Sequence, residues 1–147
     1  MINPEFKLKN LPNRTQKPRD SGLTMVMDKG LSLREAEDFL SVAGEYTDLI
    51  KLGFGTSVVT PNVKDKIKLY QDAGIAVYFG GTLFEAYIIR GQFDEYRKLL
   101  DHFNLGHAEV SDGSIEISEE EKCGYIRALA KDITVLSEVG SKDTDKI

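Results

Sequence analysis

The sequence predicts an α/β fold built around a parallel β-sheet. Short apolar segments that end in polar residues and glycine recur at intervals of roughly 25–30 residues, which suits units of one strand and one helix. Most of these segments are followed by an amphipathic stretch with a helix-capping signal. Strands that alternate with helices are typical of a mainly parallel sheet with covered faces. At 147 residues, the chain has the length of a single domain with a substantial core.

Residues 1–20 are expected to form an irregular arm ahead of the α/β domain, which spans residues 21–147. The arm contains three of the four prolines of the chain and an excess of basic over acidic side chains. We expect it to pack along the surface of the fold. Binding of a phosphate group or of a partner by this arm is the alternative.

Five segments are predicted to contain the strands of the sheet. Each has an apolar core and a polar end that includes glycine: Leu23–Gly30, Leu49–Gly55, Ile75–Gly81, Ala108–Gly113 and Ile133–Gly140.

Two capping boxes mark the first and the last predicted helix. Ser32 and Glu35 begin a helix that is expected to run to about Tyr46. Ser118 and Glu121 begin the last helix in the same way. The acidic residues that follow Ser118 are interpreted as a helix cap rather than as metal ligands, because the helix dipole favours negative charge in the first turn.

Three further helices are predicted between the second and the fourth strand. Thr60 is the expected N-cap of the first of them, with Pro61 in its first turn and Gly74 at its end. A short helix over Leu83–Ile89 and a longer one over Phe93–Leu105 follow the third strand.

Two architectures fit this order of elements. One is an open, doubly wound sheet, and the other is a barrel of eight strand–helix units. A complete barrel of this kind usually needs about 250 residues, whereas five units are counted here. We therefore expect the chain to be either a part of a longer protein or a natural short form.

Composition and charge exclude several classes of protein. There are 19 basic and 24 acidic side chains, and a net charge of −5 argues against a dominant electrostatic grip on nucleic acid. The single cysteine, Cys123, excludes an internal disulfide framework and fits a cytoplasmic setting. No apolar run approaches the roughly 20 residues of a membrane span, and the N-terminus lacks the apolar core of a signal peptide.

Charged residues lie at the ends of the predicted strands, where parallel sheets usually carry their functional groups. A lysine or glutamate within a buried strand is costly unless it is paired or used. Lys51 therefore either binds an anionic substrate or forms a structural ion pair inside the sheet. The strand-end charges are Asp28, Lys29, Lys51, Glu109, Asp112, Glu138 and Lys142.

Carboxylates at neighbouring strand ends predict a magnesium site. Glu109 and Glu138 lie on adjacent strands if the fourth and fifth strands pair, and Mg²⁺ takes oxygen ligands while keeping several waters. Solvated charge at the strand ends is the alternative interpretation.

A glycine-rich turn precedes the helix after the third strand. The N–H groups of Gly80, Gly81 and Thr82 are candidates to bind a phosphate, carboxylate or sulfonate group, and a simple tight turn is the alternative. Neither a phosphate-loop motif nor a dinucleotide-binding motif is present. His102 and His107 are expected to be structural or exposed.

Five strings in order along the chain resemble the phosphosulfolactate synthase family. They are DKG at 28–30, IKLGFGTS at 50–57, YFGGTLFE at 78–85, EVSDGS at 109–114 and LSEVGSK at 136–142. The resemblance extends over residues 20–143. It implies a TIM-barrel-type (β/α)8 architecture, of which this chain holds about five parallel strand–helix units, so we expect it to be the N-terminal part of a synthase-like protein.

The resemblance also implies an activity. Family members add sulfite to phosphoenolpyruvate in a reaction that depends on Mg²⁺ and gives (2R)-phospho-3-sulfolactate, a step toward coenzyme M in methane-producing archaea and toward sulfolactate in bacteria. By the same resemblance, Lys142 falls on the proposed general acid of the family, and a homo-oligomer is expected.

The other roles are inferred from position at the strand ends. We expect Lys29 and Lys51, together with the turn at residues 80–82, to bind the anionic substrates. We expect Glu109 and Glu138 to hold Mg²⁺, with Asp28 and Asp112 behind them. Two other functions remain open, namely a non-catalytic stress-associated or binding relative and another enolate-forming enzyme on the same scaffold.

Overall fold

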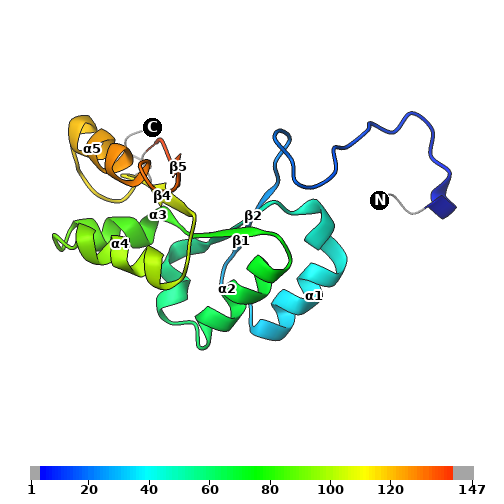
Figure 1. The fold of residues 1–147 in the computed structure, drawn as a ribbon, viewed down its shortest axis with the longest axis horizontal. Helices are drawn as coiled ribbons and strands as arrows, with labels where there is room; N and C mark the ends of the chain where they lie inside the picture. The colour runs from blue at the N-terminus through cyan, green and yellow to red at the C-terminus, as the bar shows by residue number, and fades with distance from the viewer. Residues whose placement is uncertain (1–3, 141–147) are drawn as a thin grey trace.

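The computed structural model describes residues 4–140, and Figure 1 shows that strands and helices alternate through most of this range. The predicted α/β class is therefore confirmed. In chain order the elements are β1 (Met25–Asp28), α1 (Leu33–Ala43), β2 (Leu49–Leu52), α2 (Val63–Asp72), β3 (Ala76–Phe79), α3 (Gly81–Ile88), α4 (Phe93–His102), β4 (His107–Val110), α5 (Glu119–Leu129) and β5 (Thr134–Ser137). Three short 3-10 helices, η1 (Pro4–Phe6), η2 (Gly44–Tyr46) and η3 (Gly53–Val58), complete them.

All strand pairs in the described residues are parallel. β1, β2 and β3 form one sheet in that order, and β4 and β5 form a second. β4 also contacts β3. A doubly wound sheet would reverse its strand order near the first strand. The consecutive order seen here is instead consistent with part of a TIM-barrel-like fold.

One face of the first sheet forms the core with the helices. Ile50 and Leu52 of β2 lie opposite Val77 and Phe79 of β3, and all four are almost fully buried. They pack against apolar side chains of α1, α2, α3 and α4. The other face carries Lys51 and, at its outer strand, Met25, which is 44% exposed. The alternation of side chains along each strand thus gives one helix-covered face and one partly open face.

Both predicted capping boxes are present, at Ser32–Glu35 and at Ser118–Glu121. The first helix ends at Ala43 and continues to Tyr46 only as the 3-10 turn η2.

The prediction that Thr60 is the N-cap of α2 is wrong. α2 begins at Val63, and Asn62 occupies the N-cap position with a left-handed φ of 57°. The Thr60 hydroxyl donates instead to the Thr56 carbonyl, so it closes the preceding turn η3 rather than capping the helix. Pro61 accordingly lies in the turn before α2.

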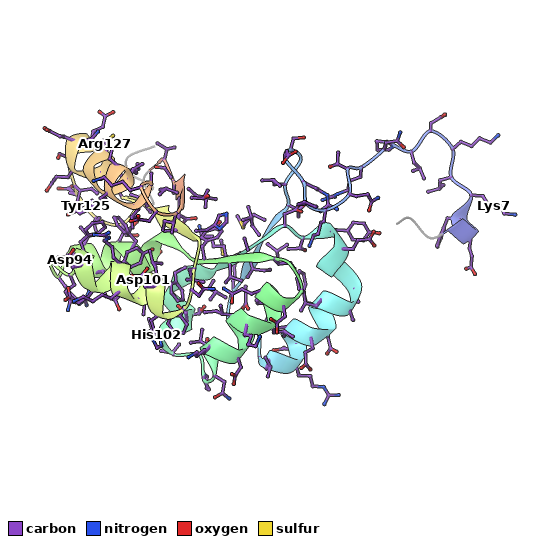
Figure 2. All side chains as sticks on the ribbon, in the orientation of Figure 1. Lys7, Asp94, Asp101, His102, Tyr125 and Arg127 are labelled. Carbon is purple, nitrogen blue, oxygen red and sulfur yellow. The ribbon has the colours of Figure 1, made fainter. Side chains whose placement is uncertain are left out.

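The N-terminal arm is anchored to the fold near its end. Arg14 and Lys17 donate to the carbonyls of Tyr46 and Gly44, and Arg19 pairs with Asp48 at 2.6 Å. The first part of the arm extends away from the helices, with Lys7 far out on it (Figures 1 and 2). The boundary between the arm and the α/β domain at residue 20 stays a prediction. The basic residues nearest to this boundary form hydrogen bonds and an ion pair with the α/β domain.

Between residues 4 and 140, every helix is too short or too polar to cross a lipid bilayer.

Candidate active site

Lys51 in β2 lies between two glutamates, one from β4 and one from the end of β5. Its Nζ is 2.6 Å from Glu109 Oε1 and 3.5 Å from Glu138 Oε2. The side chains of Lys51 and Glu109 are 12% and 6% exposed, whereas that of Glu138 is 40% exposed. We call these three residues the Lys51 cluster. The ion pair, one of the two alternatives for Lys51, is therefore present, and the cluster has an open side at Glu138.

The carboxyl ends of four strands position this cluster. The Glu138 N–H continues the β4–β5 pairing by donating to the Val110 carbonyl. The Gly80 N–H continues the β2–β3 pairing by donating to the Leu52 carbonyl. Parallel strands present their carboxyl ends at one edge, so residues distant in the sequence meet there.

Gly80 and Gly81 allow the cluster to pack closely against the start of α3. A Cβ at Gly80 would lie 3.1 Å from Lys51 Cε, and a Cβ at Gly81 would lie 3.0 Å from Glu109 Oε1. The same Cβ at Gly81 would overlap the Ser111 Cβ. The surrounding atoms therefore leave no room for a side chain at Gly80 or Gly81.

Glu109 is bound from two directions. In addition to Lys51, the Gly81 N–H donates to Glu109 Oε1 at 2.7 Å. Gly81 is the first residue of α3, where the N–H groups and the helix dipole favour an anion. The anion on Gly81 in this structure is a carboxylate of the protein itself. Thr82 follows in the first turn of α3.

The two other lysines predicted for the site are Lys29 and Lys142. Lys29 follows β1 at the same edge of the sheet and has an exposed side chain. Lys142 lies outside the described residues.

Asp28 faces the helix-covered side of the sheet, away from the cluster defined above. Its carboxylate is 2.9 Å from Lys66 Nζ, and it accepts a hydrogen bond from the Tyr70 hydroxyl and from the N–H groups of Gly30 and Leu31. Burial by itself would raise the pKa of Asp28, but the hydrogen bonds from Lys66 and the two N–H groups hold it below its usual value. Asp28 therefore ties β1 to α2.

Asp112 is linked to the Lys51 cluster through Lys122. Its carboxylate pairs with Lys122 Nζ of α5 at 2.6 Å, and the same Nζ donates to the Glu138 carbonyl at 2.7 Å. Lys122 thus ties the loop after β4 to the end of β5.

Sequence reasoning missed several buried polar residues around the site. Glu85 in α3 is 2% exposed and accepts hydrogen bonds from the Ser111 hydroxyl and the Ser114 N–H. A signal for Glu85 was available, since it stands in an otherwise apolar helix. Lys66 and Lys122 gave no such signal, because they stand among other charged helix residues and their partners are distant in the sequence.

A magnesium ion is the group that the predicted chemistry implies. Within residues 4–140, no set of three or more histidine, cysteine, aspartate or glutamate side chains gathers closely enough to hold a metal ion. Two carboxylates, those of Glu109 and Glu138, converge on the Lys51 ammonium group, and Mg²⁺ is often bound by one or two carboxylates plus substrate oxygens and waters. This pair of hard oxygen donors fits Mg²⁺, whereas Asp28 and Asp112 are held in ion pairs elsewhere.

A cavity lies at the amino ends of the strands, opposite the end that carries the Lys51 cluster. It has a volume of about 640 Å³ and is lined by Lys17, Arg19, Asp48 and His107, among others. Burial lowers the pKa of His107. Because this cavity adjoins the amino ends of the strands, it is separate from the Lys51 cluster.

Comparison with known proteins points to one family. A family model described as (2R)-phospho-3-sulfolactate synthase (ComA) matches residues 12–147. The chain is 48% identical over 128 residues to a phosphosulfolactate synthase of Methanocaldococcus jannaschii, which covers 85% of this chain and 51% of the relative. It is 37% identical over 141 residues to one of Bacillus subtilis, covering 96% of this chain and 56% of the relative. The chain thus spans about half the length of these curated relatives.

Proposed function

Because the chain belongs to the phosphosulfolactate synthase family, we propose that it carries part of the active site of such an enzyme, built around the Lys51 cluster. The observation that carries this proposal is the meeting of Lys51, Glu109 and Glu138 at the carboxyl ends of the strands. Each of the three stands in a string by which the sequence resembles the family.

The proposed reaction joins sulfite to phosphoenolpyruvate and gives (2R)-phospho-3-sulfolactate. The sulfur lone pair of sulfite attacks the methylene carbon, so a C–S bond forms while the electron pair of the C=C bond moves toward the carboxylate. The carbon that bears the phosphate then takes up one proton, and the phosphate group is retained. The site must therefore bind anionic groups, stabilise an enolate-like charge and supply a proton.

The lysines are the proposed anion-binding groups. Lys51 has three N–H donors, and its two carboxylate partners leave it able to contact a further anion. Lys29 stands at the same edge with an exposed side chain, and the turn at residues 80–82 contributes through Thr82. Gly80 and Gly81 serve chiefly by allowing close packing, since their N–H groups bind Leu52 and Glu109.

Glu109 and Glu138 are the residues that would hold Mg²⁺. The ion, when bound, supplies positive charge that stabilises the enolate-like form of the substrate carboxylate. Glu138 is the more exposed of the two, so its carboxylate is the one on the solvent side of the cluster. Asp28 and Asp112 do not contribute to this site, because they form ion pairs with Lys66 and Lys122.

Lys142 is the proposed proton donor. This role comes from its place in the string LSEVGSK, by which the sequence resembles the family. The complete protein is proposed to be a closed barrel of eight strand–helix units that forms homo-oligomers. The consecutive order of β1, β2 and β3, followed by the contact of β4 with β3, supports the barrel.

The test is an assay of the complete gene product with phosphoenolpyruvate and sulfite. Phosphorus NMR of the mixture follows the loss of phosphoenolpyruvate and the appearance of a phosphorylated sulfonate. We expect product only when sulfite and Mg²⁺ are both present. Consumption of phosphoenolpyruvate without sulfite would instead indicate another enolate-forming enzyme. Absence of any turnover by the folded protein would indicate a non-catalytic relative.

A further inference from the structure

Tyr78 of β3 is a polar residue that lies next to Lys51 of the cluster. In the β2–β3 register, Tyr78 lies directly opposite Lys51. Residues paired across parallel strands point to the same face of the sheet. Tyr78 therefore extends over the same face and toward the same edge as Lys51, on the side away from the helix-packed core.

The side chain of Tyr78 is buried but its hydroxyl is not used by the fold. The residue is 1% exposed. Among the residues that the structure describes, none forms a hydrogen bond with the Tyr78 hydroxyl, whereas the hydroxyl of Tyr70, also buried, donates to Asp28. Among the described residues, the fully buried side-chain oxygens without a partner are Ser57 Oγ and Tyr96 Oη, and the Tyr78 hydroxyl is not one of them. The Tyr78 hydroxyl is therefore open to a hydrogen bond with a ligand.

The charges of the cluster act on this hydroxyl. Burial and the negative charges of Glu109 and Glu138 raise the pKa of Tyr78 well above its usual value. The hydroxyl stays protonated over the physiological range, so it is available as a hydrogen-bond donor.

We propose that the Tyr78 hydroxyl is a substrate-contacting group, which donates a hydrogen bond to an anionic oxygen of the substrate bound at the Lys51 cluster. This inference rests on the proposed function. A neutral donor suits this position, because negative charge builds up on the substrate carboxylate as the C–S bond forms. A donor aimed at such a charge lowers the barrier without adding a second buried cation.

Tyr78→Phe in the complete gene product tests this role, because it removes the hydroxyl and keeps the ring. Tyr96→Phe is the matched control, since Tyr96 is also buried and its hydroxyl has no partner among the described residues, but it lies in the aromatic cluster of α3, α4 and α5. We expect Tyr78→Phe to lower kcat by about 10-fold or more with little change in KM. Tyr96→Phe should leave both within about twofold, and neither change should lower the unfolding temperature, because neither removes a protein hydrogen bond.

The outcomes separate this inference from the proposed function. An active wild type with an equally active Tyr78→Phe variant would overturn the role of Tyr78 and leave the proposed function intact. An inactive wild type would overturn the proposed function. In that case, calorimetry measures the affinity of the wild type and of Tyr78→Phe for phosphoenolpyruvate. An affinity about fivefold or more weaker in the variant supports the contact with the Tyr78 hydroxyl. Equal affinity, or no binding by either protein, overturns it.

A second measurement applies if Tyr78→Phe does not fold. The ultraviolet difference spectrum of the Tyr96→Phe protein, recorded on addition of phosphoenolpyruvate, reports on the remaining tyrosines. A tyrosine difference band that saturates with ligand supports the proposal, and a spectrum unchanged at saturating ligand overturns it.

Discussion

At the scale of single residues, Lys51 is a charged side chain placed inside a sheet. A buried ammonium group costs several kcal/mol unless carboxylates compensate it, and the paired glutamates here supply that compensation. The surface pair Lys68–Asp72 has a similar distance of 2.8 Å, but both of its side chains are exposed. An ion pair of the same length contributes far less to stability when both side chains are exposed to water than when they lie inside the sheet.

Replacement of the two lysines should show this difference. We expect Lys51→Met to lower the free energy of unfolding by about 3–5 kcal/mol, because it leaves the Glu109 carboxylate buried without its cation. Lys68→Met should change it by less than about 1 kcal/mol. Urea unfolding followed by circular dichroism measures both, and equal effects would contradict the structural account of the cluster.

Two glycines in helices give a second prediction at this scale. Gly81→Ala places a Cβ against Ser111 and Glu109, so we expect a loss of stability of about 1–3 kcal/mol. Gly124→Ala in α5 meets no atom within 4 Å and should stabilise the protein by about 0.5–1 kcal/mol through better helix propensity. Thermal unfolding of the two variants compares them directly. Stabilisation by Gly81→Ala would show that the packing around Glu109 is looser than described.

Sequence reasoning at the residue scale found charges but not their partners. Lys51, Glu109 and Glu138 were recognisable because each is a charge at or within an apolar strand. The pairing of Asp28 with Lys66 could not be recognised in the sequence. The last residue of a strand can point to either face of the sheet, and nothing in the neighbouring sequence shows which face it takes once the strand has paired.

At the scale of elements, Asp28 joins β1 to the turn before α1 and to α2. Its hydrogen bonds reach residues in both. Since its pKa is lower in the folded protein than in the unfolded chain, the unfolded chain binds more protons as the pH falls. The stabilisation from Asp28 is thus fully present above about pH 4 and is lost as the pH falls through the lowered pKa.

Asp28→Asn should remove this part of the pH dependence. We expect the free energy of unfolding of the wild type to fall as the pH drops below about 4. The Asp28→Asn variant should have a lower free energy of unfolding at neutral pH, and that free energy should change less as the pH drops below about 4. Asp72→Asn, at an exposed pair, is the control and should keep the wild-type slope. Parallel curves for Asp28→Asn and the wild type would contradict the assignment.

Helix starts were predictable where the cap is local. The capping boxes at Ser32 and Ser118 each need only residues within one turn, and both are present. The start of α2 was missed because the Thr60 hydroxyl has two possible partners, and the bond to Thr56 exists only once η3 has folded.

At the scale of the whole molecule, the place of β4 favours one of the two predicted architectures. β4 contacts β3, whereas in a doubly wound sheet of the dinucleotide-binding type the fourth strand lies beside the first. One face of the β1-β2-β3 sheet is also partly open. The chain spans about half of its curated relatives, and a barrel of eight units would place further strands beside this sheet. Periodicity in the sequence predicted the strand–helix units, but it could not show how the strands are ordered, because that order depends on contacts between segments distant in the sequence.

The most direct test of the account is the Mg²⁺ dependence of product formation by the complete gene product and its Glu138→Gln variant. The Glu138 side chain is 40% exposed, so this change should leave the fold intact. We expect the wild type to form the phosphorylated sulfonate only with Mg²⁺, and Glu138→Gln to need about 10-fold or more Mg²⁺ for half-maximal rate. Identical Mg²⁺ dependence of the two proteins, or no product from the wild type, would contradict the placement of the active site at the Lys51 cluster.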